Sequence, residues 1–192
     1  MPKSPGNSAG KPLYSLAHLT LIGCTAPELI YIAARAGYDA VSPRFIQMNV
    51  PGEFAESPVD KQMVRATKTA IATTGLKVLD VELARITEDC DPRSFEPACE
   101  LGGELGAKRM IMSAWTTDRT DRNFLIDCYG ETCDIAAQYG LSVDLEFPSF
   151  SRLRTLDETL DIVRAADRPN GGILVDTLYL HLAYVTHLKQ SE

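Results

Sequence analysis

Five polar residues stand at or near the ends of short apolar runs, where a strand would meet a loop. They are His18, Arg44, Glu82, Glu146 and Asp176. Carboxylates are able to take up and return protons, and an arginine such as Arg44 is able to meet a phosphate or carboxylate. In a barrel of parallel strands, the carboxyl ends of all strands meet at one rim, and catalytic side chains come from that rim. These five residues therefore make such a rim the first hypothesis for the site.

The elements that would position these residues alternate along the chain. Apolar runs predict strands, and capping residues followed by amphipathic stretches predict helices. Thr25 with Glu28 and Thr155 with Glu158 have the spacing of a capping box. The predicted strands cover 15–23, 39–46, 77–86, 109–114, 141–147 and 172–178, and the predicted helices cover 25–37, 60–75, 91–106, 122–139 and 155–167.

Four of the predicted helices stop at a glycine that leads directly into a strand, which is one βα unit repeated. Such repetition predicts a parallel sheet with helical crossovers, either an open doubly wound sheet or a closed barrel. The first strand lacks the G-x-G-x-x-G turn of dinucleotide-binding sheets, and the polar strand ends favour the barrel. We therefore predict an α/β fold, a TIM-type (β/α) barrel that is incomplete, with about six of the eight βα units.

The composition limits the class of protein. The 192 residues are 45% apolar and 23% charged, and the formal net charge is −7. We expect a disordered leader at 1–12 and a single barrel domain at 13–192. The negative charge and the absence of a long apolar run argue against nucleic-acid and membrane partners. Five cysteines without a C-x-x-C pair indicate reduced thiols in a cytoplasmic protein.

Four segments carry a resemblance to a known family. They are SLAHLTLIGCTAPELIYIAARAGYDAVSPR (15–44), VLDVELARIT (78–87), VDLEFPSF (143–150) and GILVDTLYLH (172–181). Over 13–181 the chain resembles the sugar phosphate isomerase/epimerase family, the xylose isomerase-like TIM barrels. The pairing of a glutamate on the fifth strand with V-D-T on the sixth is the more specific part of this resemblance.

The resemblance implies a divalent-metal site. In that family, strands five to eight each give one metal ligand, and Glu146 and Asp176 match the first two. The last two positions would lie beyond residue 192. Such oxygen-rich ligation favours Mn²⁺ or Mg²⁺, with Co²⁺ or Zn²⁺ also possible. Related epimerases have a substrate-contacting histidine three residues after the aspartate; here Tyr179 holds that position, and His181 is the nearest histidine.

The implied function is metal-dependent isomerisation or epimerisation of a small sugar or related polyhydroxy carbonyl compound. Proton transfer would pass through an ene-diolate, with Glu146 as the catalytic acceptor. His18, Arg44, Glu82, Trp115 and His181 are the candidate substrate-binding residues. Two alternatives stay open: a lyase or dehydratase on the same scaffold, and a truncated barrel that acts as a non-catalytic fragment or subunit. Whether the chain is an enzyme is therefore uncertain at this stage.

Several candidate residues also have a structural explanation. Glu146 fits a solvated carboxylate, Asp176 a helix cap, His18 a satisfied core histidine, and Arg44 a structural arginine. Of Glu82 and Arg85, only one is able to face the lumen of a regular strand, and Glu82 is preferred. The incomplete barrel leaves the first and sixth strands as open edges, so we expect a homo-oligomer or a partner chain to cover them.

Overall fold

The computed structural model describes residues 12–54 and 57–190, with side chains placed up to residue 185. The expected leader at 1–12 lies outside these residues, apart from its last position. The strands are β1 (Ser15–Ala17), β2 (Ala40–Ser42), β3 (Lys77–Val78), β4 (Asp80–Ile86), β5 (Arg109–Ala114), β6 (Ser142–Glu146) and β7 (Gly171–Leu174). The helices are η1 (His18–Leu21), α1 (Ala26–Ala36), α2 (Lys61–Thr74), η2 (Pro92–Phe95), α3 (Glu96–Glu104), α4 (Arg122–Gln138), α5 (Leu156–Ala166) and α6 (Thr177–Gln190).

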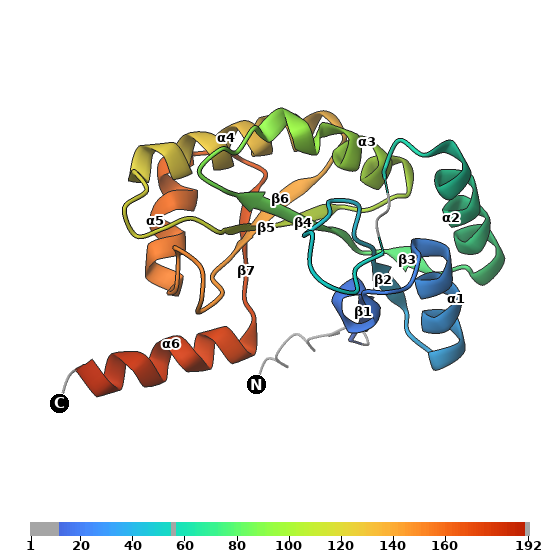
Figure 1. Cartoon of the computed structure of the whole chain (residues 1–192), viewed down its shortest axis with the longest axis horizontal. Coiled ribbons are helices and arrows are strands. Elements are labelled where there is room, and N and C mark those ends of the chain that lie inside the picture. Colours follow the sequence, from blue (N-terminus) through green and yellow to red (C-terminus); the bar gives the residue numbers. More distant parts are fainter. Residues whose placement is uncertain (1–11, 55–56, 191–192) are drawn as a thin grey trace, which may run out of the picture.

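All paired strands run parallel and follow the order of the chain. They form two ladders, β1-β2-β3 and β4-β5-β6-β7, joined by a bridge between Arg44 and Glu82. Only Leu79 separates β3 from β4, so the two form one interrupted strand. The predicted six βα starts are thus present, and Figure 1 shows the strands as a curved wall with helices α1 to α5 around its outer side. This is the incomplete (β/α) barrel that the sequence predicts.

Capping residues set the helix boundaries. Thr25 and Thr155 each accept a hydrogen bond from the backbone of the glutamate three residues later, and that glutamate bonds back, so both predicted capping boxes are confirmed. Gly37 ends α1 with a φ of 83°, a left-handed conformation that glycine adopts without steric cost. The local sequence therefore fixes where these helices start and stop.

The strands place apolar and polar side chains on opposite faces. In β6, Val143 and Leu145 are fully buried and belong to the core between the sheet and the helices, as Met110 and Met112 of β5 do. Because neighbouring strand residues point to opposite faces, the intervening positions face the inside of the barrel. The buried polar residues at such positions are Ser42, Arg44, Asp80, Glu82, Ser113 and Asp144. The lumen is therefore lined by charged and hydroxyl groups.

Three predicted strands were too long. The first ends at Ala17, because the chain turns back at His18, whose ring contacts the Cys24 carbonyl. The second ends at Ser42, since Pro43 has no N–H to continue the ladder. The last predicted strand, 172–178, corresponds to β7 and ends at Leu174.

Helix α6 is exposed, and the two outer strands have unpaired edges. In the described chain, β1 and β7 each have a strand partner on one side only. Figure 1 shows α6 leaving the end of β7 and extending away from the other helices. Large apolar side chains are exposed there, namely Val175, Leu178, Leu180, Leu182 and Tyr184. Among the described helices, none has the length and apolarity needed to cross a bilayer.

Candidate functional site

Glu146 and Asp176 are brought together at the carboxyl end of the sheet. Glu146 is the last residue of β6, and Asp176 lies two residues beyond the end of β7, the neighbouring strand. Burial, and after it the negative charge of Asp176, raise the pKa of Glu146 to about 7. Within the described chain, the Glu146 side chain has no hydrogen bond or salt bridge. The two carboxylates thus repel each other without a cation between them.

Asp176 also caps α6. Its Oδ1 accepts hydrogen bonds from the backbone N–H groups of Leu178, at 2.7 Å, and Tyr179, at 3.2 Å. This cap explains why the chain turns into a helix where the sequence predicted strand up to Leu178. The other oxygen, Oδ2, has no such bond in the described residues, so the cap leaves one oxygen for a ligand.

The carboxylate pair fits part of a divalent-metal site. Carboxylate oxygens are the ligands that Mg²⁺ and Mn²⁺ prefer, and repulsion between the two groups would be relieved by a cation. However, the described residues contain no cluster of three or more His, Cys, Asp or Glu side chains able to hold a metal ion. Glu146 and Asp176 could therefore supply two ligands, and no third His, Cys, Asp or Glu of the described residues joins them.

A second charged cluster surrounds Arg44. Its Nη2 donates a hydrogen bond to Oε2 of Glu82 at 3.0 Å, and its Nη1 lies 3.8 Å from Oε1 of Glu53. All three side chains are less than a tenth exposed. Burial raises the pKa of Glu82 to about 7, and the positive charge of Arg44 opposes that shift. In this cluster each carboxylate has a cationic neighbour.

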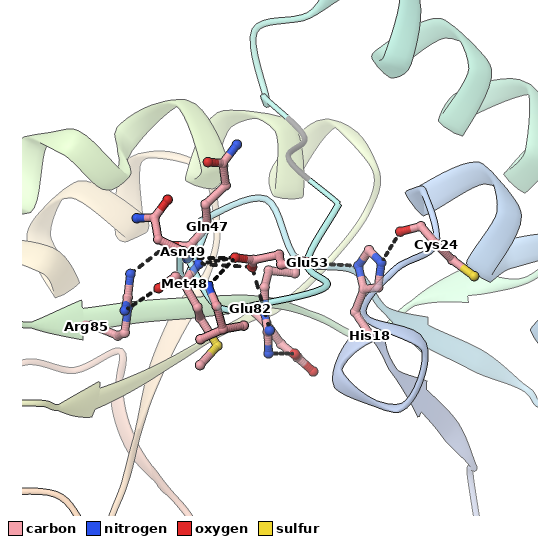
Figure 2. A network of polar contacts seen from close by, with 10 residues as sticks. His18, Cys24, Gln47, Met48, Asn49, Glu53, Glu82 and Arg85 are labelled. Atoms are coloured by element: carbon pink, nitrogen blue, oxygen red, sulfur yellow. Dashed lines mark hydrogen bonds and ion pairs between the residues drawn. The ribbon is translucent and has the colours of Figure 1, made fainter.

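The loop 47–53, between β2 and α2, is held over this cluster (Figure 2). The Glu53 carboxylate accepts hydrogen bonds from the backbone N–H groups of Met48 and Asn49, at 2.7 to 3.0 Å. Arg85 donates to the carbonyls of Gln47 at 2.6 Å and Met48 at 3.2 Å. Glu53 was not among the sequence candidates, because it lies in an irregular loop without periodicity.

His18 links two strands through backbone contacts. Its Nδ1 accepts a hydrogen bond from the Arg44 N–H at 2.9 Å, and its Nε2 donates to the Cys24 carbonyl at 2.8 Å. Burial lowers the pKa of the ring, which favours its neutral form. Both ring nitrogens are occupied, so His18 corresponds to the satisfied core histidine that the sequence left as an alternative.

Three aromatic rings form a row beside the carboxylate pair. Trp115 follows β5, Phe150 lies in the loop after β6, and Tyr179 is in the first turn of α6. The ring centroids are 5.4 Å apart between Trp115 and Phe150 and 6.0 Å apart between Phe150 and Tyr179, both edge to face. Burial raises the pKa of Tyr179, as do the charges of Glu146 and then Asp176, which indicates that this end of the row adjoins the pair.

Of the other residues considered from the sequence, Arg85 contacts this row at Trp115, and His181 lies on α6. The Arg85 guanidinium stacks over the Trp115 ring at 5.1 Å, and the Trp115 Nε1 donates to the Ser113 hydroxyl at 2.7 Å. Arg85 thus binds the loop and the indole, while Glu82 takes the inward position that the sequence favoured. His181 is exposed on α6.

A further polar layer lies one step deeper in the lumen. Arg109 donates to the Asp144 carboxylate at 2.8 Å. Burial raises the pKa of Asp80 to about 6, a hydrogen bond from Ser42 opposes the shift, and the charge of Asp144 adds to it. Asp80 was not among the candidates, although it stands two residues before Glu82 and strand alternation places both on one face.

The family follows from comparison with known sequences. Residues 30–189 match the model of the xylose isomerase-like TIM barrel family, so the chain belongs to this family. No curated protein matches the chain.

Solved structures agree with this fold. The D-allulose 3-epimerase from Methylomonas sp. in complex with D-allulose is 21% identical, with a TM-score of 0.69 over 91% of this chain and 66% of that one. The IolI protein with a bound zinc atom is 20% identical, with a TM-score of 0.68 over 87% and 63%. The probable 3-DHS dehydratase AsbF from Bacillus anthracis is 16% identical, with a TM-score of 0.66 over 93% and 69%. The chain thus spans about two thirds of the length of these relatives.

Proposed function

We propose that the chain carries part of the active site of a divalent-metal-dependent isomerase or epimerase. The substrate would be a small sugar or a related polyhydroxy carbonyl compound. The observation that carries the proposal is the carboxylate pair: Glu146 and Asp176 stand together at the strand ends, partly desolvated and without a cationic side chain as partner. Relatives of the same fold include an epimerase and a zinc-containing protein, which supports this choice.

In this proposal, Glu146 and Asp176 hold a divalent cation through their oxygens, with Mn²⁺ or Mg²⁺ preferred and Co²⁺ or Zn²⁺ accepted. When bound, such a cation stabilises the negative charge that develops on the oxygens of an ene-diolate. Glu146, besides being a ligand of the cation, would accept the proton from the carbon next to the carbonyl, since no side chain of the described residues bonds to its carboxylate. Asp176 acts only as a ligand, since one of its oxygens already caps α6.

The substrate would lie between the aromatic row and the lumen. Sugars expose apolar C–H faces that pack on aromatic rings, and Trp115, Phe150 and Tyr179 present such rings beside the carboxylate pair. Glu82 still has Oε1 for a substrate hydroxyl, because its bond to Arg44 uses Oε2. Arg44 would then position the Glu82 carboxylate through this hydrogen bond and would not contact the substrate itself. We assign His18 a structural part, since its ring nitrogens are occupied by the backbone.

A lyase or dehydratase is the second candidate, favoured by the likeness to a probable 3-DHS dehydratase. Removal of a leaving group next to a ketone would use the same base and the same cation. The third candidate, a non-catalytic fragment or subunit, is favoured by the two-ligand site of the described chain.

Deuterium exchange in D₂O distinguishes these functions. The chain is incubated with Mn²⁺ and a panel of ketoses and hydroxy ketones, and proton NMR follows the carbon next to the carbonyl. An isomerase or epimerase incorporates deuterium at that carbon, and the Glu146→Gln variant does not. Loss of water from the substrate would identify a dehydratase instead. No exchange and no elimination with any compound would favour the non-catalytic alternative.

For the open edges, we propose a second copy of the chain as the partner. The exposed apolar side chains of α6 and the unpaired sides of β1 and β7 form a surface that a two-fold dimer buries by using the same patch twice. We also propose a cytoplasmic location, supported by the five free thiols.

A further inference from the structure

The charges around the proposed substrate position bear on the chemical class of the substrate. A phosphate ester carries a charge of about −1.5 to −2 at pH 7, and a sugar acid carries a carboxylate. Protein sites for such groups present arginine or lysine N–H donors that are open to the ligand. A charged substrate would therefore need an open cation at the carboxyl end of the sheet, where Glu146 and Asp176 lie.

Arg44 is buried in the lumen with two carboxylates beside it. Its Nη2 lies 3.0 Å from Oε2 of Glu82, and its Nη1 lies 3.8 Å from Oε1 of Glu53. Glu53 still balances Arg44 if Glu82 takes up a proton. The Nε and Nη1 atoms of Arg44 have no hydrogen-bond partner in the described chain, but both are shielded from solvent. An anion that reached them would also meet the two carboxylates, so Arg44 is not open to an anion.

Arg85 binds the loop between β2 and α2 (Figure 2). Its Nη1 donates to the Met48 carbonyl at 3.2 Å, and its Nη2 donates to the Gln47 carbonyl at 2.6 Å. The guanidinium also lies over the Trp115 ring at 5.1 Å. Burial lowers the pKa of Arg85, and the negative charge of Glu53 opposes that shift. Both terminal nitrogens are thus in use, and a carboxylate lies near enough to offset the charge.

The other arginines of the loops at this end of the sheet have acidic neighbours. Among the described residues, they are Arg154 with Asp118 at 2.8 Å, Arg152 with Glu158 at 4.0 Å, and Arg119 with Glu88 and Asp121 around one pocket. The lysines whose side chains are described lie on α2 or at the amino ends of strands, namely Lys61, Lys68, Lys77 and Lys108. Within the described chain, no cation of these loops stands apart from acidic or carbonyl groups.

The site therefore has no excess of positive charge. Arg44 and Arg85 carry two positive charges, and two carboxylates lie close to them. The deeper layer adds two carboxylates and one arginine, namely Asp80, Asp144 and Arg109. A divalent cation would offset the carboxylates of Glu146 and Asp176. An anionic substrate group would lose its hydration without gaining a cation, which lowers its affinity.

The groups that remain for a substrate suit uncharged hydroxyl groups. Glu82 has Oε1 left after its bond to Arg44, and a carboxylate oxygen accepts a hydrogen bond from a sugar hydroxyl. The aromatic row of Trp115, Phe150 and Tyr179 packs on apolar C–H faces. Both kinds of contact bind a neutral polyhydroxy compound, and neither binds an anion.

We propose that the site takes an uncharged polyhydroxy carbonyl compound and discriminates against its phosphate ester and against sugar acids. This inference rests on the proposed function, because it concerns the substrate bound beside Glu146 and Asp176. Trp115 is the only tryptophan of the chain and belongs to the aromatic row, so its fluorescence reports binding at this position.

The test titrates the full chain, in the presence of Mn²⁺ at pH 7.5, with matched pairs of compounds and follows the Trp115 fluorescence. The pairs are D-fructose with D-fructose 6-phosphate and D-ribulose with D-ribulose 5-phosphate. In each pair that binds, we expect the ester to bind at least roughly tenfold more weakly than its parent sugar. Raising KCl from about 0.01 M to about 0.15 M shortens the Debye length from about 30 Å to about 8 Å, and the affinity for the ester should not fall.

Two variants with the same charge change locate the discrimination. Glu82→Gln should narrow the difference between sugar and ester several-fold, because Arg44 is then opposed by Glu53 alone. Asp161→Asn removes a carboxylate from the outer helix α5 and should leave the difference unchanged. Circular dichroism melts establish that both variants are folded.

An ester that binds as tightly as its parent sugar, or whose affinity falls as KCl rises, would overturn the inference. Deuterium exchange on that ester would leave the proposed function standing. Absence of binding by every compound would count against both. Equal differences in Glu82→Gln and Asp161→Asn would also overturn the inference, since the discrimination would not come from the charges around Arg44.

Discussion

Two glutamates on strands of the same barrel, Glu82 within β4 and Glu146 at the end of β6, have opposite surroundings. The pKa of Glu82 is raised to about 7 by burial, against the opposing positive charge of Arg44. The pKa of Glu146 is raised to about 7 by burial together with the negative charge of Asp176. The Glu82 cluster contains its own cation and fixes a loop through Glu53. The Glu146 pair contains only negative charge. A half-buried carboxylate without a cationic partner is costly, which makes Glu146 a candidate for binding a ligand or taking part in a reaction.

This difference indicates a structural role for the Arg44 cluster and a functional role for the pair of Glu146 and Asp176. Arg44, Glu82 and Glu53 form a unit in which both carboxylates have a cation beside them, although the Nε and Nη1 of Arg44 are buried without a hydrogen-bond partner in the described chain. Glu146 and Asp176 form an open unit that a divalent cation would complete. Substitutions in the Arg44 cluster should therefore act on stability, and substitutions in the Glu146 pair on metal binding.

Removing Arg44 should have the largest effect on stability. The Arg44→Met variant keeps the side-chain volume but leaves Glu82 and Glu53 buried without a cation. Removing one partner of a buried pair costs about 3–5 kcal/mol, so the free energy of unfolding in urea at pH 7.5 should fall by about that amount.

An exposed ion pair provides the control for Arg44. Arg122 bonds to Asp161 at 2.6 Å, but both side chains are about half exposed. Arg122→Met should therefore cost less than about 1 kcal/mol. Similar losses in the two variants would contradict the view that the Arg44 cluster is a buried scaffold.

Protonation of Asp80 should affect how the free energy of unfolding depends on pH. Asp80 is a buried carboxyl with one oxygen unpaired in the described chain. Its pKa is raised from 3.8 to about 6. The folded state thus holds the proton more tightly than the unfolded state, and this contribution to stability is lost as the pH rises from about 4 to about 6. Asp80→Asn should avoid that loss and gain on the order of 2–3 kcal/mol at pH 7.5, with no gain at pH 4.

Urea titrations of wild type and Asp80→Asn at both pH values measure this difference. A variant that is equally destabilised at pH 4 and pH 7.5 would show that Asp80 acts through its hydrogen bond to Ser42 rather than through its charge.

The exposed apolar surface of α6 should affect assembly. Light scattering of the wild type should give a dimer, and the double variant Leu178→Asp, Leu182→Asp should weaken the dimer by at least roughly tenfold in dissociation constant, about 1.4 kcal/mol. The exposed charge change Arg122→Met serves again as the control, because it lies on another helix. A monomeric wild type at all concentrations would refute the proposed dimer.

The fold was predictable from local signals. Thr25, Thr155 and Gly37 act through bonds to residues a few positions away, so their types and spacing were sufficient to place the helix ends. The extents of the strands were not predictable in the same way. The second strand ends early at a proline, whereas the first and sixth end where His18 and Asp176 bind backbone groups of the following turn.

The site was predictable only in part. Strand alternation and the family resemblance led to Glu146, Asp176, Arg44 and Glu82, but gave no indication that Arg44 binds Glu82 across 38 residues. Glu53 was missed, because its role depends on a loop conformation that follows no periodic pattern. Trp115 was expected to line a pocket, but its neighbours Phe150 and Tyr179 come from two other segments that only the tertiary fold brings close.

The most direct test of the account is calorimetric titration of the chain with Mn²⁺. Wild type, Glu146→Gln and Glu82→Gln are compared, because both glutamates lie on strands of the barrel and have similarly raised pKa values. We predict that Mn²⁺ binds to the wild type and to Glu82→Gln with similar affinity, and at least roughly tenfold more weakly to Glu146→Gln. Absence of binding to the wild type, or equal binding to all three proteins, would contradict the assignment of Glu146 and Asp176 as a metal site.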